Sequence, residues 1–203
     1  PRRRAPHNAA MSDFDAPRNS TKADVRRERR GEVEVVVKDY GARAWWVRTF
    51  YGRPTLRREA RVYERLKGVP GIPRYFGLER PDALTLEFAH GRQLGAFAAG
   101  EVAPAVFDAL DAILDAVHAR GAAIADLHRS NVLVADDGAV HVIDFAVARL
   151  ARDPARPGPL VRLLQRLDRH AAARMRARAL GLPEPVPTGV FGFLYRLVRR
   201  LKP

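Results

Sequence analysis

The feature that most constrains this chain is a short hairpin pattern with a polar residue next to each strand at its open end. Two short apolar runs, 132–135 and 139–143, are separated by Asp-Asp-Gly at 136–138. An Asp-Gly pair readily adopts the positive φ angles of a tight turn, so the pattern predicts an antiparallel hairpin. Asn131 immediately precedes the first strand and Asp144 immediately follows the second. Antiparallel pairing therefore places an amide oxygen and a carboxylate at the same end of the hairpin.

A third oxygen-bearing side chain is expected at this end. Asp126 lies five residues before Asn131, on a loop that follows a predicted helix and can reach the hairpin. Hard oxygen ligands such as Asn131 and Asp144 suit Mg²⁺. A single Asp or Asn beside a turn is more often a cap or turn residue than a ligand. Three such residues around one hairpin instead favour a site.

The remaining pattern predicts a mixed chain of strands and helices. The expected strands, read from alternating or continuous apolar runs, are 32–39, 74–78 and 84–88. The expected helices, read from apolar residues at helical spacing or from helix-prone composition, are 55–66, 103–119, 160–180 and 190–201. Residues 1–20 mix Pro, Arg, Asn and Ser without periodicity and are expected to be disordered. One domain, at most bilobal, is the prior for 203 residues.

Around these residues the sequence resembles the protein-kinase-like superfamily. Residues 117–146, VHARGAAIADLHRSNVLVADDGAVHVIDFA, are similar to its His-x-x-Gly, catalytic-loop and metal-binding segments. Upstream, VVVK resembles the strand that supplies the ATP lysine, RREARVYERL the helix that supplies its carboxylate partner, and LTLEFAHGRQL the hinge. The resemblance covers roughly residues 31–150. It implies a reduced bilobal α+β fold, with a small sheet and one helix in an N-lobe (21–89) and a mainly helical C-lobe (90–203).

The resemblance also implies a role for each matching position. Lys38 would contact the α- and β-phosphates of ATP and Glu59 would hold that lysine, while Asn131 and Asp144 would bind Mg²⁺. Asp126 would orient or deprotonate the acceptor hydroxyl. Phosphoryl transfer needs such groups because its transition state is mainly a problem of positioning and neutralising charge. The implied adenine contacts are the backbone of Glu87 and Ala89 and the side chains of Val36 and Leu133. His118 is interpreted as a packing residue.

The sequence departs from the family pattern at three places. Ala146 replaces the usual glycine after Asp144 and Phe145, and Ile124 and Ala125 replace the His-Arg pair of regulated protein kinases. The arginine that would bind an activation-loop phosphate is therefore missing, which argues against that form of control. No Gly-rich loop precedes Lys38, since that segment contains only Gly31. A pseudokinase scaffold that binds nucleotide without transfer is thus an alternative.

The acceptor stays open at this point. Only 59 residues follow Asp144, too few for the helical substrate platform of typical eukaryotic-type protein kinases. What remains resembles the minimal branches, namely the bacterial lipopolysaccharide-core kinases, the RIO-like kinases and the small Bud-type kinases. Asp-Leu-His-x-x-Asn, at 126–131, also resembles small-molecule kinases of the aminoglycoside and choline type. These imply either a sugar hydroxyl of a glycolipid or a Ser/Thr hydroxyl of a protein as acceptor.

Charge and composition limit the possible partners and the possible chemistry of this chain. The formal charge of +13 lies at the two ends, with 9 Lys and Arg against 4 Asp and Glu in residues 1–30 and 13 against 3 in residues 149–203. A basic end suggests an anionic partner, here an acidic membrane face or glycolipid, and a solvated arginine-rich surface without a partner is the alternative. Nucleic acid is the weaker candidate because the aromatic residues are not interleaved with the C-terminal arginines. The absence of cysteine excludes disulfides and thiol catalysis. The sequence has no apolar run long enough to span a membrane. We therefore expect a cytoplasmic location, at most peripheral at the inner face of the membrane.

Overall fold

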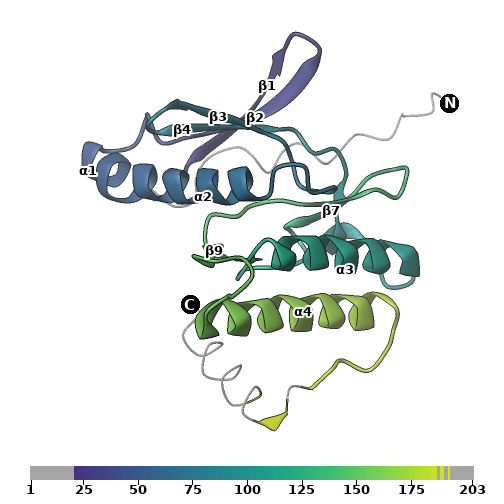
Figure 1. Ribbon diagram of the computed structural model, residues 1–203. Coiled ribbons are helices and arrows are strands. Elements are labelled where there is room, and N and C mark those ends of the chain that lie inside the picture. The colour runs from purple at the N-terminus through teal and green to yellow at the C-terminus, as the bar shows by residue number, and fades with distance from the viewer. Residues whose placement is uncertain (1–20, 187, 190–191, 193–203) are drawn as a thin grey trace, which may run out of the picture. The chain divides into compact units, whose positions relative to one another are not determined.

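The computed structural model describes residues 21–186, 188–189 and 192 (Figure 1). Within them the chain is a mixed α+β protein, with antiparallel sheets and three helices longer than two turns, which confirms the predicted class at this level. The expected disorder of residues 1–20 lies outside the described residues, as does the expected helix 190–201 except for residue 192. The chain forms two compact units, one from residues 21–60 and 75–88 and one from 61–74 and 89 onward.

The first unit contains a four-stranded antiparallel sheet. Its strands are β1 (Asp24–Arg30), β2 (Val33–Asp39), β3 (Tyr75–Arg80) and β4 (Ala83–Glu87), in the order β1-β2-β4-β3. The strands predicted at 32–39, 74–78 and 84–88 are confirmed with small shifts at their ends. One face of β2 buries Val35 and Val37, which form an apolar cluster with Ala83 of β4. The opposite face carries Val36 and Lys38.

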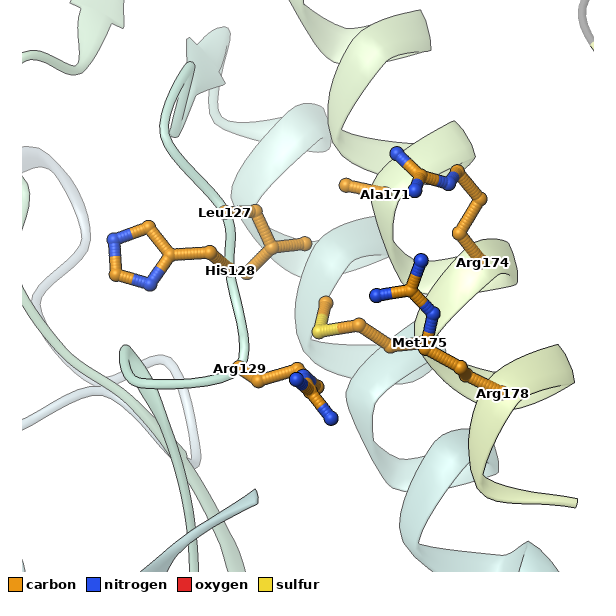
Figure 2. Close-up of a pocket in the computed structure, with 7 residues that line it drawn as sticks. All are labelled: Leu127, His128, Arg129, Ala171, Arg174, Met175 and Arg178. Carbon is orange, nitrogen blue, oxygen red and sulfur yellow. The ribbon is translucent and has the colours of Figure 1, made fainter. Parts of the chain in front are cut away.

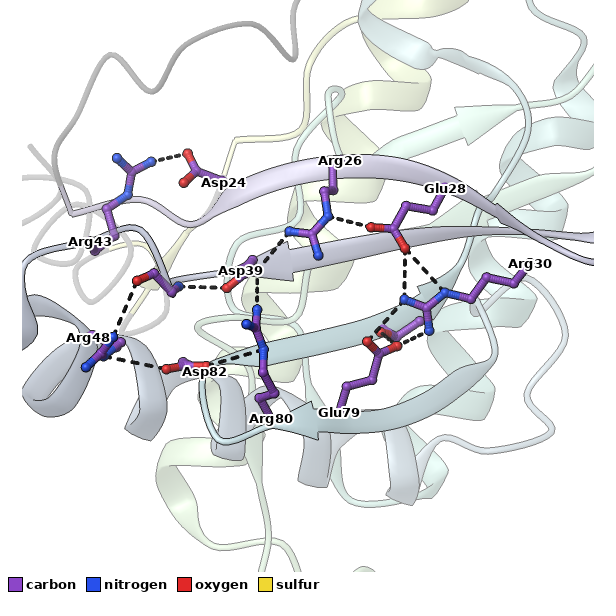
Figure 3. Close-up of polar contacts among 12 residues, drawn as sticks. Asp24, Arg26, Glu28, Arg30, Asp39, Arg43, Arg48, Glu79, Arg80 and Asp82 are labelled. Carbon is purple, nitrogen blue, oxygen red and sulfur yellow. Dashed lines mark hydrogen bonds and ion pairs between the residues drawn. The ribbon is translucent and has the colours of Figure 1, made fainter.

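Charged side chains connect β1 to the rest of this sheet (Figure 3). Arg26 donates to Glu28 at 2.5 Å and to Asp39 at 2.8 Å. Arg30 binds both Glu28 and Glu79 of β3. Opposite charges that meet across strands stabilise an antiparallel pair, and this explains how a strand of sequence DVRRERR forms without apolar alternation. Strand β1 was not predicted from the sequence because it lacks that alternation.

Asp39 occupies the end of β2, directly after Lys38, and is held by several donors. Arg80 reaches its carboxylate at 2.5 Å and the Gly41 N–H donates to it at 2.7 Å. Burial alone would raise the pKa of Asp39, but the hydrogen bonds from Arg26 and Gly41 and the charge of Arg80 outweigh it. The pKa of Asp39 therefore lies below its ordinary value, and this carboxylate stays ionised at the end of β2, next to Lys38.

Helix α2 (Arg53–Arg65) confirms the helix predicted at 55–66 and contributes residues 53–60 to the first unit. It follows a short helix α1 (Trp45–Val47) and a π-helical turn (Arg48–Gly52) that the sequence pattern did not reveal. Gly52 fits there because a Cβ at this position would lie 2.5 Å from the Tyr40 ring. The buried stripe of α2 contains Leu56 and Ala60 and, between them, Glu59.

The second unit is built on two helices that lie side by side, α3 (Pro104–Ala119) and α4 (Pro159–Ala179) (Figure 1). Both confirm predicted helices. Apolar residues of α3 at helical spacing are buried: Val106, Phe107, Leu110, Ile113, Leu114 and Val117. On the exposed side Arg176 of α4 pairs with Asp108 of α3 at 2.9 Å, and Arg169 pairs with Asp115. The two helices thus share an apolar contact with ion pairs beside it.

Short strands complete this unit. The hairpin consists of β7 (Val132–Val134) and β8 (Val140–Val142), paired Val132 to Val142, and β5 (Arg92–Gln93) adds a third strand after which the chain makes a 3₁₀ turn (Leu94–Ala96). A separate pair joins β6 (Ala122–Ala123) to β9 (Arg149–Leu150). The predicted hairpin is confirmed, whereas the two-residue strands β5, β6 and β9 are too short to leave a periodic pattern.

Helix α4 lies within the basic segment 149–203, for which an anionic partner is expected. Met175 is buried, and Leu164 packs against the cluster of Ala123, Ala151 and Val161. These apolar residues of α4 thus pack against the protein. Four of its arginines are exposed, Arg162, Arg166, Arg169 and Arg178, and Arg174 and Arg176 are half-buried. None of the described helices combines the length and the hydropathy that a membrane span requires.

Candidate functional site

The loop that carries Asp126 is fastened to α4 by one buried carboxylate. Asp168, 1% exposed, accepts the Ile124 N–H at 2.8 Å and the Ala125 N–H at 2.9 Å. Its Oδ2 also lies 3.1 Å from Nε2 of His118, at the end of α3. Buried backbone N–H groups need acceptors, and here a side chain satisfies two in succession. Asp168 therefore fixes the backbone immediately before Asp126.

Gln165 supports the same segment from the preceding turn of α4. Its side-chain amide donates to the carbonyl of His118 at 3.2 Å and to that of Ala122 at 3.0 Å. Gln165 and Asp168 are three residues apart and so share one helix face. Together they hold the chain from the end of α3 to Ala125. His118, interpreted from the sequence as a packing residue, here also takes part in this hydrogen-bond cluster.

Ala125 adopts a backbone conformation that favours glycine. Its φ is 66°, and no side chain with a Cβ enters this left-handed region without cost. For an L-residue the cost is about 1–2 kcal/mol. The Asp168 carboxylate, bonded to the Ala125 N–H, contributes to holding this geometry. The fold thus accepts local strain in the residue that immediately precedes Asp126.

We expect the substitution Ala125→Gly to stabilise the protein. Relief of about 1–2 kcal/mol of strain exceeds the about 0.4–1 kcal/mol that glycine adds to the entropy of the unfolded chain. The net gain is about 0.5–1 kcal/mol in the free energy of unfolding, measured by denaturant titration. The matched control is Ala112→Gly on the exposed side of α3, where glycine costs about 1 kcal/mol. Destabilisation by both substitutions to the same extent would show that Ala125 is unstrained.

Asn131 lies where the hairpin pattern predicted it. The β7–β8 ladder continues one step further through the Ile143 N–H, which donates to the Asn131 carbonyl at 2.9 Å, so Asp144 follows directly after the residue opposite Asn131. The side-chain amide nitrogen of Asn131 donates to the backbone carbonyl of Asp126 at 3.2 Å and lies 3.0 Å from Nε2 of His128. With the nitrogen so engaged, the amide oxygen is the atom suited to bind a cation.

Asp144 is held in a left-handed conformation, with φ of 66°. Its Oδ1 accepts the Ala146 N–H at 3.3 Å. The next residue, Phe145, is fully buried, and its ring meets that of Tyr63 edge to face at 5.1 Å between centroids. An aspartate tolerates the left-handed region better than most residues do. The buried aromatic pair anchors the chain while the half-buried Asp144 carboxylate stays near the surface.

Asp126 carries a partly exposed carboxylate on this loop. Its side chain is 42% exposed, and its Oδ2 lies 3.5 Å from Nε2 of His128, a contact that is an ion pair only when the histidine is protonated. Through its backbone carbonyl, Asp126 is also bonded to Asn131. The structure thus links the Asp126 and Asn131 positions directly. A surface carboxylate on a fixed backbone can accept a proton from, or orient, an incoming hydroxyl group.

In the first unit the structure brings together Lys38 and Glu59. The lysine Nζ lies 2.6 Å from Oε1 of Glu59, with side chains 16% and 1% exposed. Glu64 on the same helix, by contrast, is exposed. A buried ion pair is costly in desolvation, so its presence is poorly explained by stability alone. The pair joins β2 to α2 on the face of the sheet that also carries Val36.

The residues expected around adenine are distributed as follows. Val36 is half-buried and paired with Leu86 in the register of β2 and β4. Glu87, the last residue of β4, and Ala89, just after it, are also half-buried. Leu133 is buried on β7, between Gln93 and His141 of the neighbouring strands. Their predicted contacts with adenine stay a prediction.

The oxygen atoms of Asn131 and Asp144 suit a Mg²⁺ ion that is also bound by a nucleotide. They are too few for a metal ion bound by protein side chains alone. Within the described part of the chain no group of three or more His, Asp or Glu side chains is arranged to hold a metal ion. Mg²⁺ bound to a nucleotide needs only one or two protein oxygens, since phosphates and waters supply the rest. The Asn131 amide oxygen and the Asp144 carboxylate are of the right type for that role.

Sequence reasoning missed Asp168 and Gln165. Both lie within the helix predicted at 160–180, and no role was predicted for either. A signal was present, however, because Asp168 lies on the same helical stripe as the buried Val161, Ala172 and Met175. A charged residue in the middle of an apolar stripe indicates a buried role.

Comparison of the sequence with protein-family models and with curated proteins finds no match to either.

Proposed function

We propose that this chain is an ATP-dependent phosphotransferase with a reduced bilobal protein-kinase-like fold, moving the γ-phosphoryl group of Mg·ATP to an alcohol acceptor. The observation that carries the proposal is the Lys38–Glu59 ion pair. The resemblance pairs these two residues across 21 positions of sequence, and the ion pair at 2.6 Å agrees with it. A lysine held by a buried carboxylate is a fixed positive charge suited to nucleotide phosphates.

Each group contributes one part of the chemistry. Lys38 would neutralise charge on the α- and β-phosphates, and Asn131 and Asp144 would hold the Mg²⁺ that offsets the charge of the phosphate oxygens during transfer. Asp126 would orient the acceptor hydroxyl and accept its proton. Asp168 and Gln165 position that loop without touching a substrate. The adenine would be held by the backbone of Glu87 and Ala89 and by Val36 and Leu133.

The acceptor is proposed at the level of its chemistry. A primary or secondary hydroxyl, either of Ser/Thr in a protein or of a sugar in lipopolysaccharide core, fits a base such as Asp126. The basic side of α4 supports an anionic acceptor or an acidic membrane face.

A nucleotide-binding scaffold is the second candidate, favoured by the turn between β1 and β2. This turn is tight and includes Gly31 with φ of 63°, without the run of glycines that would wrap backbone N–H groups over phosphates. The loss of those donors would weaken positioning of the γ-phosphate more than binding of the nucleotide as a whole. Transfer activity therefore distinguishes the two candidates.

The first test is stabilisation by nucleotide. Mg·ATP at about 100 times its dissociation constant should stabilise the folded protein by about 2.7 kcal/mol, seen as a higher melting temperature. Lys38→Met should remove most of this increase, measured against the variant's own melting temperature without nucleotide. Lys67→Met, at an exposed lysine, is the matched control and should keep it. An increase that is equal in both variants, or absent from the wild type, would contradict the proposal.

A further inference from the structure

A small basic pocket lies between the loop that carries Asp126 and helix α4. It has a volume of about 170 Å³ and is lined by residues of that loop and of α4: Leu127, His128, Arg129, Ala171, Arg174, Met175 and Arg178. Figure 2 shows the Arg129 side chain extending from the loop on the side of α4, and Arg174 and Arg178 on neighbouring turns of that helix. The His128 ring points away from them. Three guanidinium groups therefore gather at one cavity.

One carboxylate partly neutralises two of these arginines. Glu184 lies 2.9 Å from Nε of Arg174 and 2.7 Å from Nε of Arg178. The two hydrogen bonds lower the pKa of Glu184, so it is ionised at neutral pH. Arg129 has no carboxylate partner among the described residues. Three positive charges against one negative charge leave the pocket with a net charge of about +2.

We propose that this pocket binds the phosphate group of a small soluble phosphomonoester, which bridges Arg129 of the loop to Arg174 and Arg178 of α4. A phosphomonoester carries about −1.5 to −2 charges at neutral pH and so matches the net charge. A carboxylate would leave one positive charge unbalanced. Guanidinium groups bind phosphate oxygens through paired N–H donors. Glu184 engages the Nε atoms, and its charge competes with the ligand.

The size of the pocket selects among ligands. Sites for whole drug-sized ligands or cofactors usually measure about 300–1,000 Å³, so 170 Å³ has room for a phosphate group with a few attached atoms but not for a complete nucleotide inside it. None of the lining residues is among those proposed to hold ATP or Mg²⁺, so the site is distinct from the proposed ATP site and does not depend on transfer activity. Because Leu127 and Arg129 lie within three residues of Asp126, a bound phosphate would link that loop to α4 at a second place, further along the helix than Asp168.

The experiment measures binding of glycerol 3-phosphate and of inorganic phosphate to the full chain by calorimetry, at constant ionic strength. Saturable binding with one site is expected. Arg129→Ala and Arg178→Ala should each weaken it by about 10-fold or more, the loss expected for a charge-assisted hydrogen bond. Arg169→Ala, on the same helix but paired with Asp115 outside the pocket, is the matched control and should leave it unchanged.

A variant that should strengthen phosphate binding provides a further test. Glu184→Gln removes the competing charge and should strengthen binding by about 3- to 10-fold, as expected for one charge within several ångströms at the protein surface. Binding of inorganic phosphate and not of glycerol 3-phosphate would reject a phosphomonoester ligand. Equal losses in Arg169→Ala and Arg178→Ala, no gain in Glu184→Gln, or pocket-dependent binding to phosphatidylglycerol vesicles alone would each overturn the proposal.

Discussion

The variants Asp126→Asn and Asp144→Asn are expected to fail in different ways. Asp144→Asn should lose both the Mg²⁺-dependent part of the nucleotide affinity and turnover, because the carboxylate is proposed to bind the metal that bridges the phosphates. Asp126→Asn should keep nucleotide affinity, while turnover falls by roughly 10² to 10⁴, the loss expected for a positioned general base. Calorimetry for Mg·ATP affinity and a steady-state assay for turnover measure the two effects separately.

The structure makes these substitutions informative because neither should unfold the protein. Asn is among the residues that best tolerate a left-handed backbone, so it is compatible with φ of 66° at position 144. The Asp126 side chain is 42% exposed, and its amide analogue needs no new burial. Asp137→Asn in the hairpin turn is the control, since Asp137 accepts only the local Ala139 N–H among the contacts described for it. If Asp126→Asn and Asp137→Asn have equal turnover, Asp126 has no part in transfer.

The largest loss of stability is expected for Asp168→Ala. This change leaves the buried N–H groups of Ile124 and Ala125 without an acceptor and removes the partner of His118. An unsatisfied buried polar group costs about 1–3 kcal/mol, so the combined loss is about 3–5 kcal/mol in the free energy of unfolding. Denaturant titration measures it. A value of this size is a large part of the total stability of a single domain.

A control and a local measurement make this prediction specific. Asp115→Ala on α3 removes only an exposed ion pair with Arg169, which is worth about 0–1 kcal/mol. In the wild type the Ile124 and Ala125 amides should exchange hydrogen slowly, and Asp168→Ala should accelerate both beyond what global unfolding explains. Unchanged protection of these amides in the variant would show that Asp168 does not hold the loop.

Elements with a strong apolar period were predictable from the sequence. Helix α3 and the hairpin of β7 and β8 follow directly from apolar spacing and from the Asp-Gly turn at 137–138. Strand β1 was not predictable in this way, because cross-strand ion pairs such as Arg26 with Asp39 replace apolar burial. The π-helical turn at Arg48–Gly52 depends on packing of Gly52 against Tyr40, which no local pattern reveals.

In the candidate site, too, some features could be predicted from the sequence and others could not. Asn131 and Asp144 could be placed from the hairpin alone, since antiparallel pairing fixes which residues meet at its end. The left-handed backbone at Ala125 and the clamp by Asp168 could not, because Asp168 comes 42 residues after Asp126 and meets its loop only through tertiary packing. Glu59 was separable from Glu64 only once burial was known.

The most direct test of the central claim is transfer of labelled γ-phosphate from Mg·ATP to whole-cell protein and lipopolysaccharide fractions. The wild-type protein should label a component of one fraction in a Mg²⁺-dependent manner, and Asp126→Asn and Asp144→Asn should not. The fraction that is labelled identifies the acceptor as a protein or a sugar hydroxyl. If the wild type labels neither fraction although it binds Mg·ATP, the nucleotide-binding scaffold takes the place of the transferase. If it does not bind Mg·ATP at all, or if both variants label as the wild type does, the kinase assignment is wrong.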